Sequence, residues 1–328
     1  MSDVLLLAIP RLASRCRFLL QAMGGPALLC SFLMGGLANV EVTAQETFRT
    51  RVVLLGTGTP NADPERSGPA TAIVVDDRAY LVDAGAGVVR RAAMAARDRE
   101  IPALRVPQLH HVFLTHLHSD HTVGLPDLLL SPWVLDRPVS LNVYGPPGTK
   151  KMMNGIVDAW SADISVRIDG PEPRDANRNA YRALTTEIEP GLVYEDDLVK
   201  VYAILVDHGG WEQPVAYRFV GPDRTIVISG DTRPSDSIVE ACGGCDILVH
   251  EVYSAERFTT RPPAWQRYHS RFHTSTVELA DIANRARAGL VVLYHHLFWG
   301  TDDEGLLREI RAAGYSGPLV SGRDLDVY

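Results

Sequence analysis

Residues 115–121 concentrate the side-chain types that bind transition metals. This stretch reads Thr-His-Leu-His-Ser-Asp-His, and the whole protein has only 11 histidines in 328 residues. Imidazole and carboxylate groups are the ligands that hold Zn²⁺ and related first-row metals. A loop that is rich in histidine by accident is therefore improbable, and the stretch predicts a metal site. Its candidate ligands are His116, His118, Asp120 and His121.

A strand and a helix must flank these ligands to position them. Residues 112–114 are apolar and favour β-structure, which indicates the end of a buried strand. Residues 127–135 are predicted to form a helix. The four ligands would therefore lie on a tight strand-to-helix loop, where two histidines face one metal while Asp120 and His121 face a second.

The pattern in residues 115–121 resembles the HxHxDH signature of the metallo-β-lactamase superfamily. Residues 55–60, Leu-Gly-Thr-Gly-Thr-Pro, resemble the opening of its ribonuclease Z branch. A flavo-diiron oxygen reductase would carry Glu in place of His118, so the resemblance implies hydrolysis rather than redox chemistry. It covers about residues 50–300 and implies an α/β (α+β) fold. This fold is a four-layer αββα sandwich with the metals between loops at one edge of its two sheets.

Three further ligands follow from this resemblance, and each of them ends a predicted strand or follows one directly. Strand register favours His295 over its neighbour His296 as the last of the three. The resemblance implies two Zn²⁺ ions, with Mn²⁺ or Fe²⁺ as alternatives. The first ion would bind His116, His118 and His208, the second would bind Asp120, His121 and His295, and Asp231 would bridge them.

Two residues outside this ligand set are candidates for proton transfer. Glu251 ends a predicted strand, and His273 precedes a predicted helix. By the resemblance, metal-bound hydroxide attacks the substrate, and Glu251 orients His273 so that His273 protonates the leaving oxygen. Asp120 completes the set of catalytic candidates. A buried structural Glu–His pair is the alternative, and Asp83 either hydrogen-bonds the ligand loop or is a plain turn residue.

The remaining pattern predicts an ordinary globular domain. The histidines outside the candidate site are expected to be structural or exposed, with His110 and His111 before a strand and His269 in a loop. Residues 163–206 are expected to contain strands and loops. Helices are expected over residues 88–99, 148–156, 276–289 with Gly289 as the stop, and 305–313, and a hairpin over residues 71–82.

The N-terminal segment has the features of a signal peptide. Three arginines within residues 11–17 precede an uncharged, mostly apolar run over residues 18–40, and residues 42–44 offer a cleavage site. Glycines and a proline in the run favour a signal peptide over a membrane anchor. The sequence thus predicts a removed segment, residues 1–44, and one catalytic domain, residues 47–328, that is exported to the periplasm or secreted.

Only Cys242 and Cys245 remain after such a removal, as Cys-Gly-Gly-Cys. In an oxidising compartment the two thiols could form a disulfide. Because no thioredoxin-like context surrounds them, a structural turn is favoured over redox work.

Charge and composition bear on the substrate. The formal net charge is −8, lysine occurs only at positions 150, 151 and 200, and no stripe of basic residues stands out. The resemblance points to a phosphodiesterase that could act on tRNA, but the charge, the expected export and the lack of a basic tRNA-holding arm favour a small phosphodiester. The alternatives are an exported arylsulfatase, another ester or lactone hydrolase, and a non-catalytic zinc-binding scaffold. A stable membrane partner is not expected, and a homodimer remains open.

Overall fold

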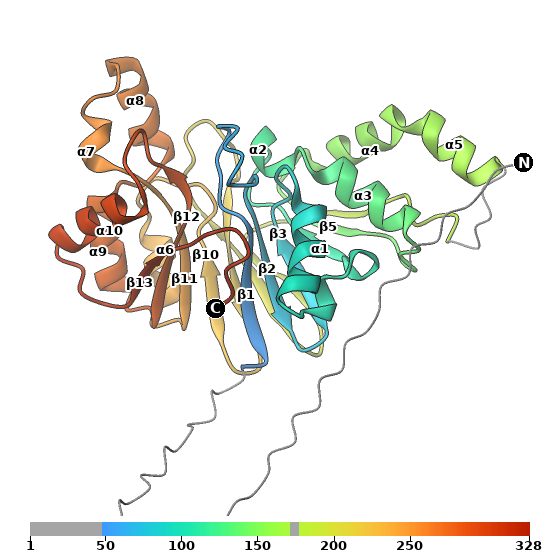
Figure 1. Ribbon diagram of the computed structural model, residues 1–328, viewed down its shortest axis with the longest axis horizontal. Helices are drawn as coiled ribbons and strands as arrows, with labels where there is room; N and C mark the ends of the chain where they lie inside the picture. The colour runs from blue at the N-terminus through green and yellow to red at the C-terminus, as the bar shows by residue number, and fades with distance from the viewer. Residues whose placement is uncertain (1–47, 171–176) are drawn as a thin grey trace, which may run out of the picture. The chain divides into compact units, whose positions relative to one another are not determined.

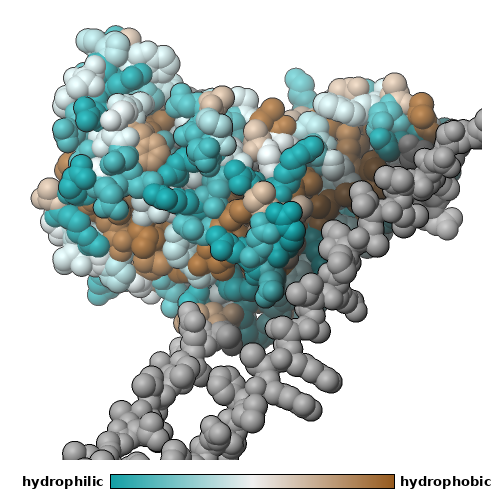
Figure 2. Space-filling model, in the orientation of Figure 1, coloured by the Kyte–Doolittle hydropathy of each residue, from teal (hydrophilic) through white to brown (hydrophobic). Residues whose placement is uncertain are grey.

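The computed structural model describes residues 48–170 and 177–328, which belong to one compact unit (Figure 1). The predicted signal peptide, residues 1–44, lies outside the described residues. No helix in the described part is long and apolar enough to cross a bilayer. Hydrophilic and hydrophobic residues are interspersed over the face seen in Figure 2.

The first sheet contains six strands in the order β1-β2-β3-β4-β5-β6. β1 to β3 pair antiparallel, whereas β3 to β6 pair parallel. Asp76 takes the left-handed conformation in the tight β2–β3 turn, so the predicted hairpin is present. The strands are β1 (Thr50–Gly56), β2 (Ala70–Val75), β3 (Arg78–Val82), β4 (His111–Phe113), β5 (Asn142–Gly145) and β6 (Leu184–Glu187).

The second sheet contains seven strands in the order β13-β12-β11-β10-β9-β8-β7. β7 to β10 pair antiparallel, and β10 to β13 pair parallel. The strands are β7 (Gly191–Glu195), β8 (Lys200–Leu205), β9 (Val215–Val220), β10 (Thr225–Ile228), β11 (Ile247–Tyr253), β12 (Leu290–Leu297) and β13 (Leu319–Ser321).

Helices cover the outer faces of both sheets. α1, α3, α4 and α5 contribute to the apolar cluster on the first sheet, and α6, α9 and α10 contribute to the cluster on the second. The helices are α1 (Val88–Asp98), α2 (Ser119–Thr122), α3 (Leu125–Val134), α4 (Thr149–Ala159), α5 (Ser161–Asp169), α6 (Asp236–Cys242), α7 (Ala255–Phe258), α8 (Pro263–Phe272), α9 (Thr276–Ala286) and α10 (Asp303–Ala312), with short 3₁₀ turns at Pro102–Leu104 and Val106–Gln108.

Alternating side chains place strand β1 in two cores at once. Val52 and Leu54 pack between the sheets, whereas Val53 and Leu55 pack under the first helix layer. Successive strand residues point to opposite faces, so a strand buried on both sides reads as a continuous apolar run. The fold is the expected αββα sandwich.

Several element predictions were wrong in detail. Residues 163–169 belong to helix α5 rather than to a strand or loop, because Ile164 and Ile168, four residues apart, both pack on the first helix layer. Helix α9 begins as expected with a capping box between Ser275 and Glu278, but it ends at Arg287 in the left-handed conformation. Gly289 is therefore not its stop.

Cys242 and Cys245 form a disulfide at the end of α6. Both residues are buried. The pair closes the short turn that leads from α6 toward β11, which agrees with the structural role that the sequence favoured.

Candidate metal centre

The HxHxDH stretch begins where β4 ends, and Asp83 anchors it. The backbone N–H of Thr115 donates to Asp83 Oδ1 at 2.8 Å, and His121 Nδ1 lies 2.8 Å from Asp83 Oδ2. Asp83 is buried and has a positive φ of 61° just after β3. It therefore hydrogen-bonds the ligand loop, rather than serving as a plain turn residue.

Three imidazoles converge on one side of the centre. His118 Nδ1 lies 2.9 Å from His116 Nε2 and 3.1 Å from His208 Nε2. The other ring nitrogen of His208 lies 2.7 Å from the carbonyl oxygen of Phe272. A donor bond to that carbonyl fixes the tautomer and leaves the Nε2 lone pair directed at the cluster.

The remaining ligand candidates gather beside this group. His295 Nε2 lies 3.3 Å from Asp120 Oδ2 and 3.4 Å from Asp231 Oδ2. His121 Nε2 lies 3.4 Å from the other oxygen of Asp231 and 3.5 Å from Asp120 Oδ2. Asp231 Oδ2 also lies 4.0 Å from His208 Nε2, so this single carboxylate touches both groups. The structure thus brings all seven predicted ligands together, and their role as ligands stays a prediction.

The electrostatics of this cluster fit a divalent cation. Burial raises the pKa of Asp231, but the imidazoles of His295 and His121 outweigh burial and hold that pKa well below its usual range. Burial lowers the pKa of His121, but Asp231 and Asp83 together raise it well above normal. His121 Nε2 and Asp231 Oδ1 are buried without a hydrogen-bond partner in the described structure. Buried carboxylates need a positive partner, and imidazole nitrogens and carboxylate oxygens are good metal ligands. This set of groups therefore suits a metal ion.

A bulge places His295, not His296, in the centre. The β11–β12 register pairs Glu251 with Tyr294 and Val252 with His296, which leaves His295 as an extra residue with a φ of 46°. A bulge of this kind redirects a side chain beside an active site. His296 instead lies 2.9 Å from the Ser321 hydroxyl, on the far side of the strand.

Glu251 and His273 form a buried pair next to the ligand cluster. His273 Nδ1 lies 3.2 Å from Glu251 Oε1, and the backbone N–H groups of Thr232 and Thr274 donate to that oxygen at 3.1 and 3.2 Å. Burial lowers the pKa of His273 to about 4 and raises the pKa of Glu251 well above normal. His273 Nδ1 also lies 3.9 Å from Asp231 Oδ2, so His273 borders the ligand cluster.

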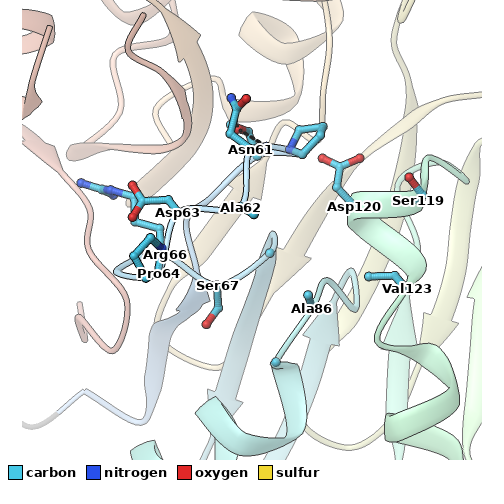
Figure 3. A pocket seen from close by; sticks show the side chains of 14 residues that line it. Asn61, Ala62, Asp63, Pro64, Arg66, Ser67, Ala86, Ser119, Asp120 and Val123 are labelled. Atoms are coloured by element: carbon cyan, nitrogen blue, oxygen red, sulfur yellow. Dashed lines mark hydrogen bonds between the residues drawn. The ribbon is translucent and has the colours of Figure 1, made fainter. Parts of the chain in front are cut away.

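Two cavities open onto the centre and share its rim. The first, of about 570 Å³, runs between the 59–68 loop and the start of α2. Figure 3 shows Asn61, Asp63 and Arg66 on one side of it and Ser119 and Asp120 on the other. The second, of about 380 Å³, is lined by His118, Asp120, Asp231 and His295 and by aromatic side chains from α8. Asp120 and Asn61 line both cavities, and Asp120 is the one candidate ligand in the described lining of the first.

The sequence reasoning missed the aromatic wall of the second cavity. His269 lies in α8 and lines this cavity, so its predicted placement in a loop was wrong. Trp265, Tyr268 and Trp299 line it as well. The signal was present, because residues 265, 268, 269 and 272 are aromatic or imidazole at helical spacing.

Comparisons with known proteins find relatives of both the sequence and the fold. A family model described as beta-lactamase superfamily domain matches residues 78–296. The ribonuclease Z of Mycobacterium bovis (strain BCG / Pasteur 1173P2) is 33% identical over 282 residues, which are 84% of this chain and 96% of that protein. That of Mycobacterium marinum is 33% identical over 281 residues, with the same coverage.

Solved structures share the fold at lower sequence identity. The metallo-beta-lactamase fold protein YhfI from Bacillus subtilis has a TM-score of 0.65 at 17% identity, covering 85% of this chain and 99% of that one. The short form of human tRNase Z has a TM-score of 0.60 at 21% identity, with 85% and 98% covered.

Proposed function

Because the chain belongs to the ribonuclease Z branch of the metallo-β-lactamase superfamily, we propose that it is a phosphodiesterase that depends on two Zn²⁺ ions. The observation that carries the proposal is the position of Asp231. It lies against His208 of the first ligand group and against both His121 and His295 of the second. A carboxylate that borders both groups of ligands would suit a pair of cations, because it has two oxygens.

The chain's own residues divide the work around a phosphodiester. The two His/Asp groups would hold the metals, which supply an acidified water and stabilise negative charge on the phosphoryl oxygens. Asp83 keeps the ligand loop in place through Thr115 and His121. Glu251 orients His273, which gives a proton to the leaving oxygen as the ester bond breaks.

The proposed substrate of this exported protein is a small phosphodiester, in preference to the 3′ end of tRNA. The mycobacterial relatives are named ribonuclease Z. This chain carries a formal net charge of −8 and only three lysines, which disfavours a polyanionic partner. Two cavities flanking the centre are of a size that suits the two arms of a small diester.

An assay panel tests this proposal. The zinc-loaded mature protein is offered phosphodiesters, aryl sulfate esters, lactones and β-lactams at equal concentration. Turnover that is highest on phosphodiesters and is lost with a chelator supports the proposal. Preferred turnover of sulfate esters or lactones would replace it with those activities, and no turnover with full metal content would favour a zinc-binding scaffold.

We also propose that residues 1–44 are removed on export. The arginines, the uncharged run and the small residues at positions 42–44 motivate this proposal. N-terminal sequencing of the exported protein tests it. An intact N-terminus in a membrane fraction would instead support an anchor.

A further inference from the structure

We propose that the cavity beside His273 binds the leaving alcohol of the substrate, and that this alcohol carries a planar aromatic ring on a short saturated spacer. The inference rests on the proposed phosphodiesterase function and names its substrate class. The inference is based on the aromatic side chains that line this cavity, because hydrolysis itself does not require them.

The wall is built from α8 and from the turn after β12. The Trp265 and His269 rings stack at a centroid distance of 5.6 Å and an angle of 23°. His269 in turn lies 4.6 Å from the Trp299 ring. Trp265 is 50% exposed although it lines the cavity, so part of its face is open to a ligand. Figure 1 shows α7 and α8 projecting together beyond the end of the sheet that carries β12.

Arg261 extends this wall with a planar cation. Its guanidinium lies 5.4 Å from the centroid of the Trp299 ring, and the side chain lines the same cavity. Its buried Nε has no hydrogen-bond partner, and it forms no ion pair with any described residue. Arginine over tryptophan continues a stacking surface and leaves donors for the rim of a planar ligand.

The position of His273 identifies which half of the substrate enters this cavity. His273 lines the aromatic cavity but does not line the first cavity, which runs between the 59–68 loop and the start of α2. A general acid must lie against the oxygen that leaves. The leaving alcohol therefore occupies the aromatic cavity, and the half that keeps the phosphorus extends toward the first cavity.

The leaving group itself indicates the spacer. A phenolate would leave without a proton, which would make the Glu251–His273 pair unnecessary. The His269 ring lies 5.5 Å from the His273 ring, and the Trp265 and Trp299 rings contact His269. An alkyl alcohol whose ring is set back from the oxygen can place the oxygen beside His273 and its ring against this wall.

Two matched diesters test this inference. One is the methyl phosphodiester of 2-phenylethanol, and the other is that of 2-cyclohexylethanol. Their leaving alcohols have closely similar acidity and size, so hydrolysis in water treats them alike. With the zinc-loaded protein we expect kcat/KM to be about tenfold higher for the phenyl compound, because stacking adds to simple apolar burial.

Tryptophan variants test which side chain causes the preference for the phenyl diester. Trp265→Ala should bring the ratio of the two kcat/KM values close to one, and so should Trp265→Leu, which keeps apolar bulk without an aromatic face. Trp160→Ala is the matched control, because Trp160 is 41% exposed and lies on the far α4–α5 side. This control should keep the full ratio.

A binding measurement separates this inference from the proposed function. Calorimetry with methyl 3-phenylpropylphosphonate and its cyclohexyl counterpart, in which carbon replaces the leaving oxygen, needs no turnover. A tenfold tighter phenyl complex that depends on Trp265 supports the aromatic subsite even if no diester is hydrolysed. Equal binding of the two analogues, or a preference that survives in both Trp265 variants, overturns it.

Discussion

Hydrogen bonds hold the buried carboxyl group of Glu251 in one orientation beside His273. One of its oxygens accepts two backbone N–H groups and contacts His273, while Oε2 is buried without a partner in the described structure. The carboxyl group is thus fixed in one orientation. His273 is held by it beside the candidate ligands, although neither residue is one of the seven.

A His273→Ala variant should separate substrates by their leaving groups. General acid catalysis contributes about 10²–10⁴-fold when the leaving oxygen needs a proton. We expect a loss of that order on an alkyl phosphodiester and little loss on a nitrophenyl diester, which leaves unaided. Steady-state kinetics with both substrates, together with elemental analysis, tests this prediction. Equal losses on both would remove the acid role, and loss of metal would make His273 a ligand.

Trp211 should report metal binding directly. Its indole N–H donates to His118 Nε2 at 3.0 Å, while Nδ1 of the same ring points at His116 and His208. If His118 Nδ1 binds a cation, His118 Nε2 must carry the proton. The N–H groups of Trp211 and His118 would then face each other as two donors, so the indole must move. Zinc should therefore change the tryptophan emission of the metal-free protein, and Trp211→Phe should abolish most of that change, whereas Trp160→Phe should not. An unaltered response in Trp211→Phe would contradict this account.

At the scale of single elements, helix α3 depends on a buried arginine. Pro132 inside α3 cannot donate to the carbonyl of Leu128. Arg137 donates to that carbonyl at 3.0 Å and to the carbonyls of Leu129 and Ala180 at 2.9 and 3.0 Å. Its side chain is fully buried, and burial lowers its pKa to about 10, so it stays charged at neutral pH.

Arg137→Ala should therefore lower the free energy of unfolding by about 3 kcal/mol, because several buried carbonyls lose their donor. Urea unfolding followed by circular dichroism measures this change. Arg90→Ala is the control, since the Arg90 side chain is 85% exposed and its one ion pair among the described residues is with Asp127. The control should change the free energy by less than about 0.5 kcal/mol. Equal effects of the two substitutions would refute the capping role.

The sequence predicted correctly those strands that their own residue pattern identifies. The strand ends that carry His116, His208 and Asp231 follow short apolar runs, and such runs are readable without tertiary information. The sequence did not predict positions that depend on contacts between segments far apart in the chain. The 261–272 segment faces the candidate ligands only because α8 packs across the end of β12, and no local pattern places it there.

The structure places His295 beside the other candidate ligands, but for a reason that the sequence does not contain. The prediction assumed regular alternation along the strand after residue 290. The structure instead inserts a bulge at His295, opposite the step from Glu251 to Val252. A bulge depends on the partner strand, so strand periodicity alone could not have revealed it.

For the molecule as a whole, buried histidines link stability to acidity. His111 begins β4 and is half-buried beside the Tyr80 and Tyr194 rings, and burial lowers its pKa to about 4. Its unfolded pKa is about 6.5, so the unfolded chain binds more protons between these values and stability falls as pH drops through this window. The groups that face it are His110, Arg78, Tyr80, Tyr194 and Asp196.

A His111→Phe variant should remove part of this acid sensitivity. The two pKa values imply that His111 costs about 2 kcal/mol of stability at pH 5 and almost nothing at pH 7.5. The difference in unfolding free energy between these pH values should therefore shrink by about that amount in the variant. Urea unfolding at both pH values measures it, and an unchanged difference would show that His111 is not desolvated in the folded protein.

Zinc titration of the metal-free mature protein, with phosphodiester turnover followed at each step, tests whether the site holds two ions. We expect turnover to rise with added zinc and to level off at two equivalents, and Asp231→Ala neither to bind the second equivalent nor to turn over. Saturation at one equivalent with Asp231→Ala unchanged, or full metal binding without any phosphodiester turnover, would contradict this expectation.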